Sequence, residues 1–344
     1  MGLPDRLPVL ATLSRRLMTA VLLLASLAGC GLVVDAIDLV HPLVRNELDA
    51  ICARHTIRVG LSVEPFQPFV FPAIYTDEGL RVTGLDVELI REISAALSQR
   101  CGRKEPIVPT LRLIRFRSLF VELSEGKLDL FVSSISANAP APGRIGLMYS
   151  TPYFEAGGIG GIAARPEVAE RIEAHLRRHP GQAAEAFSGL TVAVQEGTTA
   201  QLYAESNLTK SRLVLCDSLP AAFESKSPPI DLILGKEPVL EYTVRRSRKD
   251  WQLLRLDSGK PLLLTREHLA IVTEEESYQL QRFLNELLFR LNESGRLTEM
   301  RRRWLEEDYA YPRRAATEGL PFDADKMPQH YDQGQCRLSD HRPR

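Results

Sequence analysis

The feature of this sequence that most constrains its fold is an alternation of strands and helices that occurs twice. The first series spans residues 57–132 and begins with an alternating, β-branched strand at 57–61. An amphipathic helix follows at 85–97, with leucine or isoleucine at every fourth position. The second series spans 190–234 and repeats the same β-α-β-α-β order. This order predicts an α/β protein with two parallel sheets flanked by helices, and a ligand site in the cleft between the two lobes.

The N-terminal segment predicts export from the cytoplasm. Basic residues precede an apolar run over residues 17–28, which is shorter than the ~20 residues of a membrane-spanning helix. The run ends in Leu-Ala-Gly-Cys30, which resembles the bacterial lipobox, in which the cysteine is lipidated and becomes the mature N-terminus. We therefore expect a lipoprotein signal peptide at 1–29, a lipid anchor on Cys30 and a tether at 30–50. The protein would be periplasmic and anchored to the inner or outer membrane; an uncleaved signal anchor is the alternative.

The charge balance excludes one broad class of function. The chain has 43 Lys and Arg against 44 Asp and Glu, for a net charge of −1. Nucleic-acid-binding proteins usually show a clear basic excess, so no nucleic-acid partner is expected. The seven histidines are scattered and no C-x-x-C pair occurs, so we predict neither a metal site nor a cofactor.

Four cysteines remain after the expected cleavage before Cys30. Export would place them in an oxidising compartment, where disulfides form, and four cysteines allow three full pairings. Cys52 lies just before the first strand and Cys101 just before the second. Adjacent parallel strands would bring these positions to the same edge of the sheet, which favours a Cys52–Cys101 disulfide. A bond between Cys216 and Cys336 is the less supported companion.

Short sequence blocks follow one another in a characteristic order between Ile57 and Trp304. They are RVG at 58–60, GLDVEL at 84–89, GKLDL at 126–130, YSTPY at 149–153, VAVQEGTT at 192–199, DLILGKEP at 231–238 and LNESGRL at 291–297. No single block is specific. In their order and spacing, however, they resemble the extracellular solute-binding proteins of family 3, typified by periplasmic polar amino-acid receptors of ABC importers.

The resemblance implies a two-lobed periplasmic-binding-protein fold of type II, with two parallel-sheet lobes joined by two crossover strands. In such a fold the ligand is enclosed by a hinge movement of the lobes. The expected boundaries are 51–157 plus 268–311 for lobe 1, 165–260 for lobe 2, 158–164 and 261–271 for the hinge strands, and 312–344 for a loosely packed C-terminal extension.

The resemblance also marks candidate ligand-binding residues in lobe 1. Phe66 and Phe116 match aromatic residues whose rings would sandwich an apolar part of the ligand, and a place in the core is the alternative for each. Ser134, Ser136 and Arg144 lie in the segment that would bind a ligand carboxylate, because hydroxyl and guanidinium groups make strong hydrogen bonds to carboxylates. The loop before Arg144 is longer than the family pattern, so a solvated surface position stays open for that residue.

In lobe 2 the candidates are Thr198, Thr199 and Lys236. The two threonines precede a helix, whose free N–H groups and dipole favour an anion, although helix capping alone would also explain them. Lys236 stands where amino-acid receptors of the family usually carry an acid for the ligand's ammonium group. A lysine there attracts a carboxylate, so we expect a small polar, carboxylate-bearing ligand, either an amino acid or an organic acid. Pairing of Lys236 with Glu237, or exposure to water, is the alternative.

Three functions are compatible with these residues. The first is a monomeric, lipid-anchored binding protein that delivers its ligand to the membrane subunits of an ABC importer. The second is an accessory lipoprotein that senses a ligand and signals to a partner protein. The third is a periplasmic enzyme resembling cyclohexadienyl dehydratase, with Glu64 or Glu196 as general acid. Because no catalytic constellation is visible, we expect a binding protein rather than an enzyme.

Overall fold

The computed structural model describes residues 47–62, 64, 66–77, 79–102, 106–137, 146–155, 157–307, 319–322 and 334–340, all within one compact unit. The expected signal peptide, Cys30 and Arg144 lie outside these residues. In the described part of the chain, no helix is long and apolar enough to cross a membrane. The same part contains no group of three or more histidine, cysteine or acidic residues arranged to hold a metal ion.

Lobe 1 is built on a five-stranded sheet with the order β4-β1-β5-β12-β6. Strand β1 lies between β4 and β5 and is parallel to both, as the first β-α-β-α-β series predicts. At one side β12 pairs antiparallel with β5 and β6, because the chain returns from lobe 2 to complete the sheet. The strands are β1 (Thr56–Ser62), β4 (Val108–Ile114), β5 (Leu130–Phe131), β6 (Leu147–Tyr149) and β12 (Val272–Glu274).

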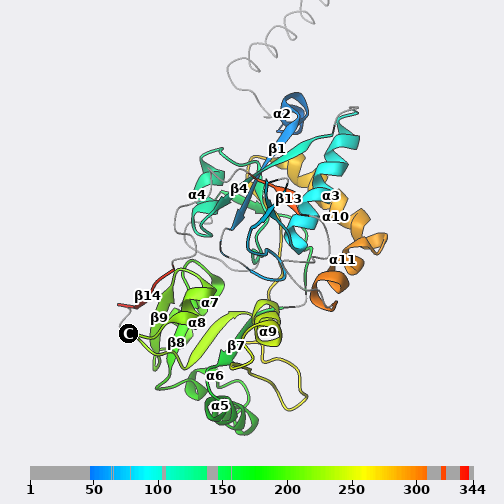
Figure 1. Cartoon of the computed structure of the whole chain (residues 1–344). Helices are drawn as coiled ribbons and strands as arrows, with labels where there is room; N and C mark the ends of the chain where they lie inside the picture. Colours follow the sequence, from blue (N-terminus) through cyan, green and yellow to red (C-terminus); the bar gives the residue numbers. More distant parts are fainter. Residues whose placement is uncertain are drawn as a thin grey trace, which may run out of the picture. The chain divides into compact units, whose positions relative to one another are not determined.

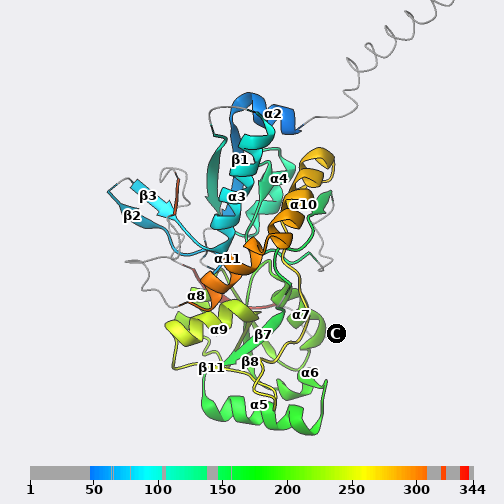
Figure 2. The ribbon, with the colours of Figure 1, turned by 90° about the vertical axis from the view of Figure 1, so that its right-hand side faces the viewer.

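Helices α3, α10 and α11 cover the same side of this sheet (Figures 1 and 2). The fully buried Trp304 of α11 donates its indole N–H to a carboxylate oxygen of Glu88 on α3 at 2.6 Å. Arg296 of α11 pairs with the other oxygen of Glu88 at 2.9 Å. Two of the distant sequence blocks are therefore in direct contact. The helices of lobe 1 are α2 (Glu47–Arg54), α3 (Leu85–Arg100), α4 (Ser118–Ser124), α10 (Tyr278–Glu293) and α11 (Arg296–Leu305).

Lobe 2 contains a six-stranded sheet with the order β11-β7-β10-β8-β9-β14. The central strands β10, β8 and β9 are parallel and are linked by α7 and α8, as the second β-α-β-α-β series predicts. The strands are β7 (Ile159–Ala163), β8 (Thr191–Gln195), β9 (Arg212–Cys216), β10 (Leu232–Lys236), β11 (Gln252–Leu253) and β14 (Cys336–Leu338). The helices are α5 (Pro166–Arg178), α6 (Ala183–Ala186), α7 (Thr199–Asn207), α8 (Leu219–Glu224) and α9 (Glu237–Arg246).

Two antiparallel segments connect the lobes, one with the described residues 154, 155 and 157–159 and the other with residues 264–269. They are called the hinge segments below. The strand β7, which the sequence places in the hinge at 158–164, belongs instead to the lobe 2 sheet, because it pairs with β10 along its whole length. At Gly158 the two hinge segments approach so closely that a Cβ atom would lie 1.8 Å from the carbonyl oxygen of Thr265. Backbone hydrogen bonds of 2.8–2.9 Å join Leu264 to Ile159, Glu267 to Gly157, and Leu269 to Phe154.

The C-terminal extension contacts both lobes, whereas the sequence suggested loose packing. Strand β13 (Leu320–Pro321) pairs with β3 (Gly79–Val82), which also pairs with β2 (Ile74–Thr76) in a small sheet. Further along, β14 pairs antiparallel with β9 of lobe 2. Both C-terminal strands have only two or three residues, which is too short for the alternating pattern that identifies a strand in sequence.

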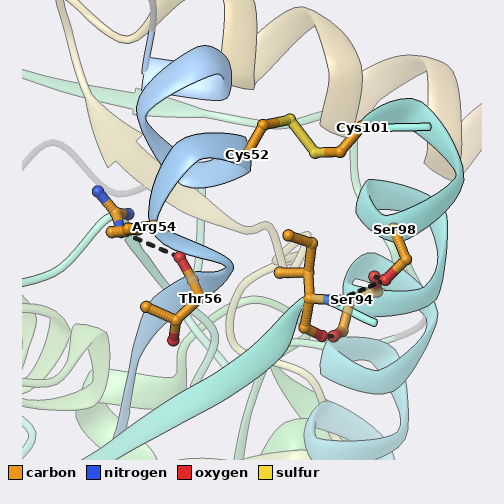
Figure 3. The surroundings of a disulfide bond; sticks show 7 residues. Cys52, Arg54, Thr56, Ser94, Ser98 and Cys101 are labelled. Carbon is orange, nitrogen blue, oxygen red and sulfur yellow. Dashed lines mark hydrogen bonds between the residues drawn. A yellow bond between two sulfur atoms is a disulfide. The ribbon is translucent and has the colours of Figure 1, made fainter. Parts of the chain in front are cut away.

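Disulfide bonds fix the start and the end of the described chain. Cys52 of α2 is bonded to Cys101, which caps α3, with 5.5 Å between their Cα atoms (Figure 3). This is the pair that the sequence favours, and the cysteines lie at the helix ends that lead into β1 and β4. Cys216 at the end of β9 is bonded to Cys336 of β14, with 4.1 Å between Cα atoms. The second bond holds the C-terminal strand on lobe 2.

Candidate ligand-binding site

A cavity of about 40 Å³ lies between the two lobes. Every candidate ligand-binding residue that the structure describes lines it, and Arg144 lies outside the described residues. Lobe 1 contributes residues that follow β1, β4 and β5, and lobe 2 contributes residues that follow β8 and β10. The candidates that line the cavity are Phe66, Phe116, Ser134, Ser136, Thr198, Thr199 and Lys236.

The two phenylalanines form a single apolar wall of the cavity. The ring centroids of Phe66 and Phe116 are 5.7 Å apart, and the rings are tilted by 49°. The rings therefore touch each other and leave no space for the ligand sandwich expected from the sequence. Glu64 holds this wall in place, because its carboxylate accepts the backbone N–H of Phe116 at 3.0 Å and the Ser62 hydroxyl at 2.5 Å.

Two buried polar groups on the cavity have no hydrogen-bond partner among the described residues: the Ser134 hydroxyl and the Gln195 side-chain nitrogen. Ser134 is 2% exposed and has a left-handed backbone, with φ of 52°. Its N–H donates to Asp86 at 2.7 Å, and the hydroxyl of Tyr153 donates to the same carboxyl at 2.8 Å. An unsatisfied buried polar group costs about 1–3 kcal/mol, so both groups favour a ligand that supplies hydrogen-bond partners.

Lys236 lies at the centre of a buried polar cluster. Its Nζ donates to the Ser136 hydroxyl at 2.7 Å and to the Glu267 carboxylate at 2.8 Å. The Ser136 and Thr199 hydroxyls also hydrogen-bond to Glu267. Only 11% of the Lys236 side chain and 6% of the Glu267 side chain are exposed. The cluster joins lobe 1, lobe 2 and the hinge, and within it Lys236 pairs with Glu267 rather than with Glu237.

The environment of Glu267 keeps it ionised. Burial by itself would raise the pKa of this carboxyl, but the adjacent Lys236 charge and the hydrogen bonds from Lys236, Ser136 and Thr199 bring the pKa below its ordinary value. Burial raises the pKa of Asp86 to about 7, against the opposing effect of its hydrogen bonds and of the Lys236 charge. Burial and the neighbouring Glu241 raise the pKa of Glu237 to about 7.

Sequence reasoning missed Glu267. The only local signal was a polar stretch at 265–268 between two apolar runs, which does not distinguish its members. What brings Glu267 to the polar residues of the cavity wall is the antiparallel contact between the two hinge segments, since its N–H bonds to Gly157. Its contact with Ser136 spans 131 positions in sequence.

The two threonines at the start of α7 have different roles. Thr198 is the N-cap: its hydroxyl accepts the N–H of Gln201 at 3.4 Å and donates to the carbonyl of Gln195 at 2.7 Å. The capping explanation therefore holds for Thr198. Thr199, one position later, hydrogen-bonds to Glu267. The helix thus presents one hydroxyl to the buried carboxylate while the other stabilises its own N-terminus.

Neither general-acid candidate lines the cavity. Glu64 is buried and accepts the backbone N–H of Phe116, and burial raises its pKa. Glu196 pairs with Arg117 at 3.4 Å and with Arg337 of the C-terminal extension at 2.7 Å. Glu196 therefore takes part in ion pairs outside the cavity, and the carboxylate in contact with the cavity's polar groups is Glu267.

Comparisons with known proteins agree with the family resemblance and with the fold. The family model of bacterial extracellular solute-binding proteins, family 3, matches residues 57–307. A curated relative, cyclohexadienyl dehydratase of Pseudomonas aeruginosa, is 24% identical over 306 residues, which cover 87% of this chain and 96% of that protein.

Solved structures share the two-lobed fold. The ancestral amino acid-binding protein AncCDT-1, a precursor of cyclohexadienyl dehydratase, has a TM-score of 0.60 at 21% identity, covering 76% of this chain and 100% of that one. The P235GK mutant of ArgBP from T. maritima has a TM-score of 0.58 at 25% identity, covering 76% of this chain and 99% of that one. AbpA from Streptococcus pneumoniae, solved with L-arginine, has a TM-score of 0.60 at 21% identity, covering 73% of this chain and 95% of that one.

Proposed function

The chain belongs to the bacterial extracellular solute-binding proteins of family 3, and from this premise we propose that it captures a small, carboxylate-bearing ligand between its lobes. The observation that carries the proposal is the convergence of one buried ammonium group and hydroxyls from both lobes on a single cavity. Lys236 and Thr199 belong to lobe 2, and Ser136 belongs to lobe 1. Charge-assisted hydrogen bonds in such a buried site are strong.

A carboxylate held by these groups would link the two lobes. Binding would then favour the arrangement in which the lobes are together, since a ligand stabilises the state that it contacts most extensively. The apolar wall of Phe66 and Phe116 would contact a non-polar part of the ligand, while Ser134 and Gln195 would bond to further polar groups. A cavity of about 40 Å³ holds only a few water molecules. The lobes would therefore separate before a ligand of amino-acid size enters.

We also propose that the protein is anchored through Cys30 on the periplasmic side of the membrane and acts as a monomer that delivers ligand to an ABC importer. Support comes from the basic and apolar N-terminal pattern ending in Leu-Ala-Gly-Cys30. Further support comes from solved relatives that are described as substrate-binding proteins of amino-acid ABC transporters. Metabolic labelling with a fatty acid should mark the wild type and not a Cys30→Ala variant.

The likeness to cyclohexadienyl dehydratase supports one alternative, an enzyme on the same scaffold. A dehydratase needs a group that donates a proton to the departing hydroxyl. Glu267 is unsuited to this role, because Lys236 keeps it ionised. Glu267 therefore does not supply that proton, and we propose binding without turnover. Formation of an aromatic product from a cyclohexadienyl acid, followed by absorbance, would overturn this preference.

Thermal unfolding and calorimetry against a ligand panel test the main proposal. The panel contains amino acids, dicarboxylates and aromatic acids, each carboxylate with and without an α-ammonium group. A ligand at a hundred times its dissociation constant adds about 2.7 kcal/mol of stability. We expect stabilisation by carboxylates that is lost in Lys236→Gln and kept in Lys249→Gln, a matched change at an exposed lysine of lobe 2. Stabilisation insensitive to Lys236 would contradict the assigned role.

A further inference from the structure

We propose that Glu267 is an internal occupant of the carboxylate-binding groups, which a ligand's carboxylate has to displace. This inference rests on the proposed function. The inference assigns a specific role to Glu267. This residue would determine how strongly the site prefers amino acids, which carry an ammonium group, over plain carboxylates, which do not.

The first argument is the identity of the groups that Glu267 contacts. Its carboxylate receives hydrogen bonds from Lys236 Nζ at 2.8 Å and from the hydroxyls of Ser136 and Thr199. These are the same groups, from both lobes, that would hold the carboxylate of a ligand. A side chain of the hinge therefore already makes the interactions that the cavity offers to an anion.

The second argument is the remaining hydrogen-bonding capacity of the cluster. An ammonium group has three N–H donors and a hydroxyl has one. Lys236 uses donors on Ser136 and Glu267, and Ser136 uses its only donor on Glu267. An incoming carboxylate would find few free donors and would meet a carboxylate of the same charge. The one remaining N–H of Lys236 is too few for a second carboxylate, so a ligand that takes over these groups has to displace Glu267.

The third argument concerns what happens to Glu267 after displacement. Only 6% of its side chain is exposed, and a buried carboxylate without a counter-charge is strongly unfavourable. An amino acid can avoid this situation, because its ammonium group can bond to Glu267 while its carboxylate bonds to Lys236. A plain carboxylate leaves Glu267 unpaired. Glu267 should therefore weaken plain carboxylates much more than amino acids.

The displacement is also connected to the hinge. The backbone N–H of Glu267 donates to the Gly157 carbonyl at 2.9 Å across the two hinge segments. The hydroxyl of the neighbouring Thr265 accepts the N–H of Ile159 at 3.0 Å. The side chain that leaves the site thus belongs to one of the two hinge segments about which the lobes would rotate.

The test is isothermal titration calorimetry on the full chain in detergent, with the wild type and Glu267→Gln. The probes are matched pairs: propionate and L-alanine, glutarate and L-glutamate, 3-phenylpropionate and L-phenylalanine. If Lys236, Ser136 and Thr199 are free of Glu267 about one-tenth of the time, only about one-tenth of the protein can bind the ligand. Removing the Glu267 carboxylate then tightens binding about tenfold. We expect a gain of about tenfold or more for the plain acid of a pair that binds, and a clearly smaller gain, or a loss, for its amino acid.

Two further variants keep the result interpretable. Glu267→Asp retains the charge beside Lys236 but is one methylene shorter, so it should give a smaller gain in the same direction even if Glu267→Gln folds poorly. Glu276→Gln changes an exposed acid in lobe 1 and should leave every affinity unchanged. The proposal would be overturned if a plain acid bound the wild type and its affinity for Glu267→Gln and Glu267→Asp were no higher. If no probe bound any variant, the proposed ligand class would be wrong, and the competition with it.

Discussion

Replacing Lys236 by methionine should destabilise the protein, because the change leaves the Glu267 carboxylate buried without its counter-charge. The two side chains are 11% and 6% exposed, and the nitrogen and oxygen atoms are 2.8 Å apart. Breaking a buried ion pair from one side costs about 3–5 kcal/mol. Ser136 and Thr199 still donate to the carboxylate in the variant, so we expect the lower end, about 3 kcal/mol.

The double variant Lys236→Met, Glu267→Leu should be much less affected than either single variant. Replacing a whole buried ion pair by apolar residues of similar size is often neutral or stabilising. We therefore expect the double variant to lie within about 1 kcal/mol of the wild type. The two residues would be strongly coupled, since the cost of each single change comes from the partner left behind.

Urea unfolding at pH 7 measures these differences, with an unchanged slope showing that the folded state stays compact. The pH dependence supplies a second check. Because the pKa of Glu267 is lowered in the folded protein, its stabilising effect is present above the ordinary value of 4.5 and is lost as the pH falls through the native pKa. The difference between wild type and Lys236→Met should therefore shrink in acid. Single variants that each cost less than about 1 kcal/mol, or costs that simply add, would refute the reasoning.

Four further changes test other parts of the structure. Ser134→Ala should raise stability by about 1 kcal/mol or more, because it removes a buried hydroxyl that has no partner. Calorimetry should nevertheless show about fivefold to tenfold weaker ligand binding. Since the pKa of Asp86 is raised from 3.8 to about 7, the folded protein holds a proton that the unfolded chain has lost. Wild-type stability should thus fall as pH rises through this window, and the urea midpoint of Asp86→Asn should show a weaker fall. Serine at both Cys216 and Cys336 opens a covalent loop with a sequence separation of 120 and should cost up to about 5 kcal/mol in urea unfolding; no change would show that β14 is held without the bond. Gly158→Ala places a Cβ 1.8 Å from a carbonyl oxygen of the facing hinge segment and should lower stability by about 2 kcal/mol or more in thermal unfolding.

The central parts of both lobes could be predicted because their signals are local. The strand at 57–61 alternates and the helix at 85–97 is amphipathic, and each pattern arises from burial of one face. The short strands had no such signal. The hairpin β2–β3 and the strands β6 and β12 have only three or four residues each, and their pairing depends on distant partners.

The candidate site divides in the same way. Ser136, Thr199 and Lys236 could be found because they lie in blocks that resemble the family. The structure brings them together because each lies at or just after the carboxyl end of a strand, and the carboxyl ends of parallel strands meet at one edge of a sheet. Glu267 could not be found, because it meets Lys236 and Ser136 only through the pairing of the hinge segments. The contact between Phe66 and Phe116 was equally inaccessible, since it depends on how two loops pack.

The C-terminal strand places the two ends of the described part of the chain in different lobes. Helix α2 lies in lobe 1 and is bonded to α3 through Cys52, whereas β14 is bonded to lobe 2 through Cys336. A fluorescent donor attached beside α2 and an acceptor attached behind β14 would each follow one lobe. Energy transfer between the two ends would then report lobe movement directly, without a label inside either lobe or near the cavity.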